Sequence, residues 1–264
     1  MASRSIAKGE ASPSPEVEGL MRHVRGCARL LALALACAFC VAAHLLTRAL
    51  RMQSHWPQRC LGWTARICGA VVELRGRPLA HDVLFVSNHT SWLDIPIIAG
   101  ATGTAFVANS GVRDWPLIGW LAGLNNTVYV DRTDRKGVQA QIDIIRQALA
   151  RHQPIAIFPE GTTSNGLDLL PFKPSLLEVL ASTPRAIRVQ PLRIDYGAAR
   201  DLAWIDDEPA PRNAWRVLTR PGRFVVRLEC LDPFSPAEIG DRKAVAAEAR
   251  RRILAASARS PSGV

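Results

Sequence analysis

The sequence predicts an α/β protein with a mixed sheet flanked by helices, and with membrane-anchoring helices at its N-terminus. This class follows from the apolar segments, from their alternation with helical patterns, and from the length and composition of the chain. A continuous apolar run occupies residues 30–46, and short apolar runs alternate with helical patterns from residue 70 onward. The chain has 264 residues, of which 48% are hydrophobic. This length accommodates one domain with a sizeable core, plus an appendage.

The N-terminal segment, residues 1–19, is rich in Ser, Pro and Glu, and we expect it to be disordered. Residues 20–69 then form a predicted membrane anchor and interfacial helix. The apolar run at 30–46 contains a single polar residue, His44. As a helix it is about 25 Å long, slightly short of the roughly 30 Å hydrocarbon core, so spanning and half-inserted arrangements both stay open. Arginines flank both ends, so the positive-inside rule sets no orientation.

A second helix is expected near residues 56–69, ending close to Gly69. Its apolar stripe consists of Leu61, Ala65, Cys68 and Val72. Trp56 and Trp63 are suited to the level of the lipid headgroups, which favours an interfacial amphipathic helix. An ordinary amphipathic core helix is the alternative.

Residues 70–264 form the predicted α/β domain. Apolar runs typical of strands occupy residues 71–74, 83–86, 105–108, 128–130, 155–158, 187–192 and 224–228. Between them, Val138, Ile142, Ile145 and Leu149 share the spacing of one buried helix face. A basic amphipathic helix is expected at residues 244–256. Because ligand sites in such sheets gather in the loops past the strand ends, reactive side chains in those loops are the candidates for a functional site.

The first such loop contains His89, followed five residues later by Asp94 at the start of a predicted helix. Thr90 or Ser91 is suited to the N-cap of that helix. If His89 lies in the preceding turn, the Asp94 carboxylate can reach back to the imidazole. Such a contact fixes the histidine tautomer and leaves the other ring nitrogen able to take a proton.

Two further strand ends carry polar residues. After the strand at 155–158 come Glu160, Gly161 and a run of hydroxyl and amide side chains that begins with Thr162 and Thr163. Lys173, one of four lysines in the chain, follows shortly afterwards. After the strand at 128–130, Arg132 is a fixed cation suited to a phosphate or carboxylate, or to a surface ion pair.

Taken together, these segments resemble the PlsC-type glycerolipid acyltransferases, the 1-acylglycerol-3-phosphate O-acyltransferase superfamily. The family's HxxxxD motif matches residues 89–94, its FPEGT motif matches 158–162, and its V-x-P-x-x-I element matches 189–194. The block between the first two motifs matches residues 115–120 and 130–132. The resemblance covers about residues 70–195. It is specific because HxxxxD, then Val-Asp-Arg at 130–132, then FPEGT follow one another at these separations.

The resemblance implies a direct acyl transfer. His89 is then the general base on an acceptor hydroxyl, and Asp94 orients it. The acceptor oxygen attacks the thioester of acyl-CoA or acyl-carrier protein, and no cofactor or metal is required. By the same analogy Glu160, Gly161 and Thr162 shape the acceptor pocket, and Arg132 meets the anionic head group. Backbone amides near Gly161 are candidates for binding the oxyanion.

Two departures from the family pattern bear on the acceptor. Members that use lysophosphatidic acid usually carry Arg after FPEGT, where this chain has Thr163. They also usually carry a Lys and a Glu near the start of the middle block, where Asn109 and Gly111 stand. We expect Lys173 to compensate in part for these missing charges. A 1-acylglycerol-3-phosphate-type lysolipid and, alternatively, lyso-ornithine lipid or another lysophospholipid both stay open as acceptors.

The charge balance agrees with an anionic lipid partner. Lys and Arg number 33 against 23 Asp and Glu, a net charge of +10. The arginines are spread along the chain, which argues against nucleic-acid binding. A dinuclear metallophosphatase needs more histidines than the six present. We therefore expect membrane lipids, an acyl donor and a lysolipid as partners. Because these donors are cytosolic, we expect the catalytic domain on the cytoplasmic face of the cell (inner) membrane.

Overall fold

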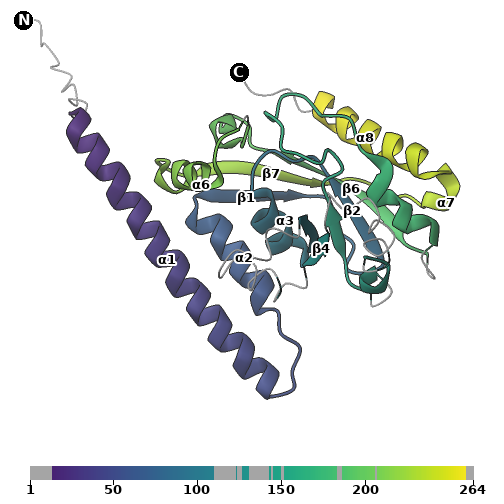
Figure 1. The fold of residues 1–264 in the computed structure, drawn as a ribbon, viewed down its shortest axis with the longest axis horizontal. Helices are drawn as coiled ribbons and strands as arrows, with labels where there is room; N and C mark the ends of the chain where they lie inside the picture. Colours follow the sequence, from purple (N-terminus) through teal and green to yellow (C-terminus); the bar gives the residue numbers. More distant parts are fainter. Residues whose placement is uncertain are drawn as a thin grey trace, which may run out of the picture.

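In the part of the chain that the structure describes, a seven-stranded sheet forms the centre (Figure 1). The computed structural model describes residues 14–109, 123, 127–130, 143, 145–149, 152–182, 186–205 and 207–259. The strands are β1 (Ala70–Arg75), β2 (Val83–Ser87), β3 (Ala105–Asn109), β4 (Val128–Val130), β5 (Ile155–Ile157), β6 (Arg188–Asp195) and β7 (Phe224–Cys230). All seven strands expected from the sequence are therefore confirmed, and the sixth extends further, to Asp195.

The sheet is mixed, as the sequence predicts. Its order is β1-β7-β6-β2-β5-β3-β4, and β6–β7 is the antiparallel pair. The other five neighbouring pairs run parallel. Every residue of β2 is buried, as expected for a central strand covered on both faces. The carboxyl ends of β6, β2 and β5 consequently lie side by side at one edge.

Helices cover both faces of this sheet. On one face, α2 (Trp56–Ile67), α3 (Asp94–Thr102) and α6 (Ala210–Thr219) contribute to a core that includes Phe85. On the other, η2 (Pro174–Ser182), α8 (Arg242–Arg259) and helical residues 145–149 pack around Leu84 and Val86. The short elements η3 (Arg200–Leu202) and α7 (Pro236–Ile239) complete the described fold. The basic C-terminal helix and the buried positions Ile145 and Leu149 agree with the sequence analysis, whereas Val138 and Ile142 lie outside the described residues.

The first helix, α1 (Pro15–Ala49), is 35 residues long and extends along one side of the molecule (Figure 1). It starts earlier than expected, because Pro15 at its first turn, with Glu16 and Glu18, is suited to a helix N-terminus. Residues 15–19, assigned above to a disordered segment, are thus helical, while residues 1–13 lie outside the described part. By length and composition, α1 is able to cross a membrane.

The two halves of α1 have different surroundings. In the first half, Arg25 donates to the carbonyl of Thr219, and Arg29 donates to that of Arg220, at distances of 2.8 and 2.9 Å. These arginines satisfy carbonyls at the C-terminal end of α6. The second half packs along α2 but leaves leucines such as Leu35 and Leu46 more than half exposed. An apolar surface of this kind calls for a partner.

The second helix, α2, packs closely against α3. A Cβ atom added at Gly100 would lie only 2.6 Å from Cα of Gly62, so two glycines permit the close approach. Ala65 and Cys68 are buried. The predicted stripe is wrong at Val72, which lies in β1, because Gly69 ends the helix with a φ of 104°. One face of α2 therefore packs as a core helix does.

Candidate active site

Three loops meet where β6, β2 and β5 end. The register pairs Val86 of β2 with Ile157 of β5. Continuing it by three residues places His89 opposite Glu160. The backbone N–H of His89 donates to Oε1 of Glu160 at 2.7 Å, so the two sequence motifs are joined directly. The fold thereby brings together residues separated by 71 positions in the chain.

The imidazole of His89 is held by Asp94. Nδ1 of His89 lies 2.7 Å from Oδ2 of Asp94, as the spacing predicts. The same oxygen accepts the N–H groups of Thr90 and Ser91 at 2.7 and 3.0 Å. An ionised carboxylate only accepts hydrogen bonds, so Nδ1 donates and, in the neutral ring, Nε2 presents its lone pair.

The expected N-cap is wrong. The helix α3 begins at Asp94 with Leu93 as its N-cap, and neither Thr90 nor Ser91 caps it. The Asp94 carboxylate accepts the amides of these two residues instead, because it folds back over the turn that carries His89. Its side chain is consequently fully buried.

Tyr196 completes the surroundings of Asp94, and sequence reasoning missed it. Its hydroxyl donates to Oδ1 of Asp94 at 2.6 Å. Burial, together with the charge of Asp94, raises the pKa of Tyr196 well above its usual range. The phenol therefore stays a hydrogen-bond donor throughout the working range of pH. Its position directly after the buried strand β6 was the available signal in the sequence.

Phe158 orients the ring of His89. The two rings stack with centroids 3.9 Å apart and an angle of 9° between their planes. Phe106 in turn stacks on Phe158, with ring centroids 5.4 Å apart. The side chain of His89 keeps 17% of its surface exposed. The imidazole is thus fixed in plane and remains accessible from solvent.

Glu160 links two loops. Its Oε2 accepts the N–H of Leu170 at 3.0 Å, while Oε1 accepts that of His89. The side chain is buried, which raises the pKa of Glu160, and the two amide hydrogen bonds oppose that rise. Both carboxylate oxygens are therefore engaged by the backbone, so Glu160 positions the His89 turn.

The rest of the FPEGT loop forms a tight turn. Gly161 has a φ of 77°, and its N–H donates to the carbonyl of Phe158 at 3.1 Å. Because this amide already donates within the turn, it is not free to bind the oxyanion in this conformation. A Cβ atom at Gly161 would lie 2.9 Å from Nζ of Lys173, so the exposed lysine lies over this turn.

The two threonines differ in their surroundings. Thr162 is exposed, whereas the hydroxyl of Thr163 donates to the carbonyl of Trp204. The amide of Trp204 in turn donates to the carbonyl of Thr90 at 2.9 Å, which ties both motif loops to one segment. Arg132 and the middle block at 115–120 lie outside the described residues.

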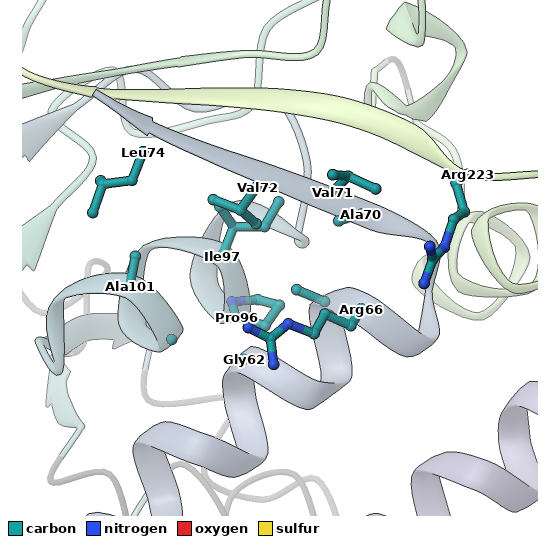
Figure 2. Close-up of a pocket in the computed structure, with 12 residues that line it drawn as sticks. Gly62, Arg66, Ala70, Val71, Val72, Leu74, Pro96, Ile97, Ala101 and Arg223 are labelled. Carbon is teal, nitrogen blue, oxygen red and sulfur yellow. The ribbon is translucent and has the colours of Figure 1, made fainter.

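A cavity of about 420 Å³ opens between α2, β1 and α3, and its lining includes none of the predicted site residues (Figure 2). Its walls are mainly apolar, with Arg66 and Arg223 among them. The lining residues are Gly62, Ala65, Arg66, Ala70, Val71, Val72, Leu74, Pro96, Ile97, Gly100, Ala101 and Arg223.

Comparison with known proteins gives consistent matches. Residues 69–195 match the family model described as Acyltransferase. The chain is 30% identical over 260 residues to a lyso-ornithine lipid O-acyltransferase of Rhodobacter capsulatus, covering 92% of this chain and 94% of that protein. It is 29% identical over 175 residues to a 1-acyl-sn-glycerol-3-phosphate acyltransferase of Neisseria meningitidis, covering 64% and 68%.

A solved structure shares the fold. The 1-acyl-sn-glycerophosphate acyltransferase PlsC of Thermotoga maritima aligns with a TM-score of 0.62 at 21% identity, covering 92% of this chain and 99% of that one. Together with the sequence matches, this means that the chain belongs to the acyltransferase family of PlsC-type and lyso-ornithine lipid enzymes.

Proposed function

We propose that this enzyme moves a fatty acyl group from acyl-CoA or acyl-carrier protein to the free hydroxyl of a lysolipid, in the biosynthesis of membrane lipids. The observation that carries the mechanism is the 2.7 Å contact between His89 Nδ1 and Asp94 Oδ2. It leaves Nε2 as the general base, in a side chain that is buried on one side and open on the other.

The chemistry follows from this pair. Nε2 of His89 takes the proton of the acceptor hydroxyl, and the oxygen attacks the thioester carbonyl. Asp94 stabilises the imidazolium that forms. Collapse of the tetrahedral intermediate forms the ester and breaks the C–S bond, and the thiol leaves with the proton returned by His89. The thioester is already activated, so no covalent acyl-enzyme is needed.

The proposed acceptor is a lyso-ornithine-type lipid. Thr163 stands where lysophosphatidic acid enzymes of the family usually carry Arg, and its hydroxyl donates inward to Trp204. The loop therefore offers no cation at this position to bind a phosphate monoester. The Rhodobacter capsulatus and Pseudomonas aeruginosa relatives, the latter 33% identical over 204 residues, are named lyso-ornithine lipid O-acyltransferases.

A 1-acylglycerol-3-phosphate is the second candidate acceptor. Lys173 favours it, because its ammonium group lies over Gly161 and is exposed beside the Glu160 loop. A compact cation at this place is suited to a phosphate head. Arg132 and Thr162 remain candidate contacts of the acceptor on the family analogy alone.

An acceptor panel tests this assignment. Purified enzyme with one labelled acyl donor is offered lyso-ornithine lipid, lysophosphatidic acid, lysophosphatidylcholine and lysophosphatidylethanolamine. We expect the highest kcat/KM with lyso-ornithine lipid, and little change there for Lys173→Ala. Preference for lysophosphatidic acid, with KM raised by Lys173→Ala, would instead establish the second candidate.

The same proposal places the enzyme on a membrane. The apolar second half of α1 anchors it, and the cytosolic origin of both donors puts the catalytic domain on the cytoplasmic face of the cell (inner) membrane. The exposed leucines of α1 and the net charge of +10 support this arrangement.

A further inference from the structure

A histidine–aspartate–histidine cluster lies at the edge of the sheet opposite the candidate active site. Asp82 immediately precedes β2, and His152 lies three residues before β5. The register pairs Leu84 with Ile155, so continuing it toward the amino ends places His81 opposite His152. Two neighbouring parallel strands thus bring these side chains together at their amino ends.

The distances within the cluster are close to those of a metal site. Nδ1 of His81 lies 3.0 Å from Oδ2 of Asp82, and Nδ1 of His152 lies 2.8 Å from Oδ1. One ligand atom from each residue falls within 4.8 Å of the other two. Around a tetrahedral zinc ion with bonds of about 2.1 Å, ligand atoms are roughly 3.4 Å apart. Binding of the ion requires the three atoms to move from these separations toward that spacing.

The backbone holds two of the three ligands in place. Asp82 and His152 have φ angles of 52° and 61°, a conformation uncommon for residues other than glycine. The carbonyl of Asp82 accepts the N–H of Arg188 at 2.9 Å, and the N–H of His152 donates to Leu149 at 3.0 Å. The two turns are therefore fixed by hydrogen bonds before any ion binds.

The donor set and its exposure select the kind of ion. Two imidazoles and one carboxylate suit Zn²⁺ and similar transition metals, whereas Mg²⁺ and Ca²⁺ prefer oxygen ligands. The His81 and His152 side chains are 71% and 52% exposed, so an ion has a path of entry and water completes its coordination.

We propose that His81, Asp82 and His152 form a binding site for a divalent transition metal, with Zn²⁺ as the expected ion. The bound ion ties the turn before β2 to the turn before β5. The site plays no part in acyl transfer, because it lies at the amino ends of the strands that carry His89 and Glu160 at their carboxyl ends. It therefore stands independently of the proposed function.

Zinc titration of the full-length enzyme in detergent micelles, after removal of any histidine tag, tests the site. The informative variants are Asp82→Asn and His152→Asn, because Asn tolerates a positive φ and lacks the anionic or imidazole ligand. His81→Ala is a third variant, at an exposed position. His55→Asn, also exposed but outside the cluster, is the matched control. All variants retain the six cysteines, so binding by thiols is a common background.

We expect the native enzyme and His55→Asn to take up about one more equivalent of Zn²⁺ than Asp82→Asn, as measured by calorimetry. In every cluster variant, this equivalent either disappears from the titration or binds with an affinity at least about tenfold lower than in the native enzyme. Zn²⁺, but not Mg²⁺, raises the Tm of the native enzyme and of His55→Asn, and it leaves the Tm of the cluster variants unchanged. Equal zinc uptake by native and cluster variants, or no zinc uptake by the native enzyme, would overturn the proposal and leave a cluster held by hydrogen bonds only.

Discussion

The hydroxyl of Tyr196 donates a hydrogen bond of 2.6 Å to Oδ1 of Asp94, the carboxylate oxygen that His89 does not contact. Asp94 thereby accepts hydrogen bonds on both oxygens, from one phenol, one imidazole and two amides. Its orientation is fixed from the side of β6 as well as from its own loop. In the proposed mechanism, Tyr196 is therefore a positioning residue that acts through Asp94.

Replacing Tyr196 by Phe tests this role. The variant keeps the ring but leaves Oδ1 of the buried carboxylate without its phenolic donor, a loss of about 1–3 kcal/mol. The carboxylate then attracts the imidazolium more strongly, so we expect kcat to fall about tenfold and the acidic limb of the pH–rate profile to move to higher pH. A Tm loss with an unchanged pH–rate profile would reduce Tyr196 to a purely structural role.

Glu160 offers a second test, because one buried carboxylate accepts two amides. In Glu160→Gln, one carboxylate oxygen becomes an NH₂ group that faces an N–H donor. We expect a destabilisation of about 1–3 kcal/mol and a fall in kcat/KM, measured by thermal unfolding and by acyl transfer.

Glu178→Gln is the control for this substitution, since Glu178 is exposed and pairs with Arg242 on the surface. Its effect should stay within about 0.5 kcal/mol. Equal effects of the two substitutions would contradict a special role of Glu160 in holding the His89 turn.

The segment that carries Trp204 is braced by an ion pair. Arg216 donates to Glu208 and to the carbonyl of Ala203, and Trp204 donates from its indole to the carbonyl of Glu208. The hydrogen bond from Arg216 is the main cause that lowers the pKa of Glu208 to about 2 from an ordinary 4.5. Its folded-state pKa therefore lies below the unfolded one, so the stabilisation is complete above pH 4.5 and lost as pH falls toward 2.

Glu208→Gln should accordingly lower the Tm at pH 7. Because the native ion pair is itself lost in acid, the difference in Tm between native enzyme and variant should shrink progressively below pH 4.5. Circular dichroism melts across this range measure it. A Tm difference that stays constant down to pH 2 would show that the ion pair does not stabilise this segment.

Membrane anchoring by α1 is tested on its surface, since the helix also holds α6. Leu31, Leu35 and Leu46 are each more than 60% exposed within the apolar run. Changing all three to Ser should shift the enzyme from the membrane to the supernatant fraction in vesicle sedimentation, because apolar burial in lipid is lost. The matched triple change at Leu20, Met21 and Val24, exposed but outside that run, should remain membrane-bound. Equal partition of the two variants would rule out the anchor.

The sequence predicts most of the fold because its signals are local. Each strand is an apolar run bounded by turn residues, so all seven were found without knowledge of their neighbours. Helix ends depended on context instead. Leu93 rather than Thr90 or Ser91 precedes α3, and the Asp94 carboxylate accepts the amides of Thr90 and Ser91 from within the helix.

The candidate site was predicted only in part, for the same reason. The spacing of His89 and Asp94 allows their contact within one loop, and the structure places them together. Tyr196 reaches Asp94 only because β6 lies beside β2, and the amide of His89 meets Glu160 only through the register of β2 and β5. Strand order and register are set by long-range packing, which a single sequence does not display.

The most direct measurement is the rate of labelled acyl transfer by His89→Ala in detergent–lysolipid micelles, beside the native enzyme. We predict a loss of at least about 10²-fold in kcat, with the circular dichroism spectrum and membrane association unchanged, because only the proposed general base is removed. Near-native turnover by a folded His89→Ala enzyme would contradict the account.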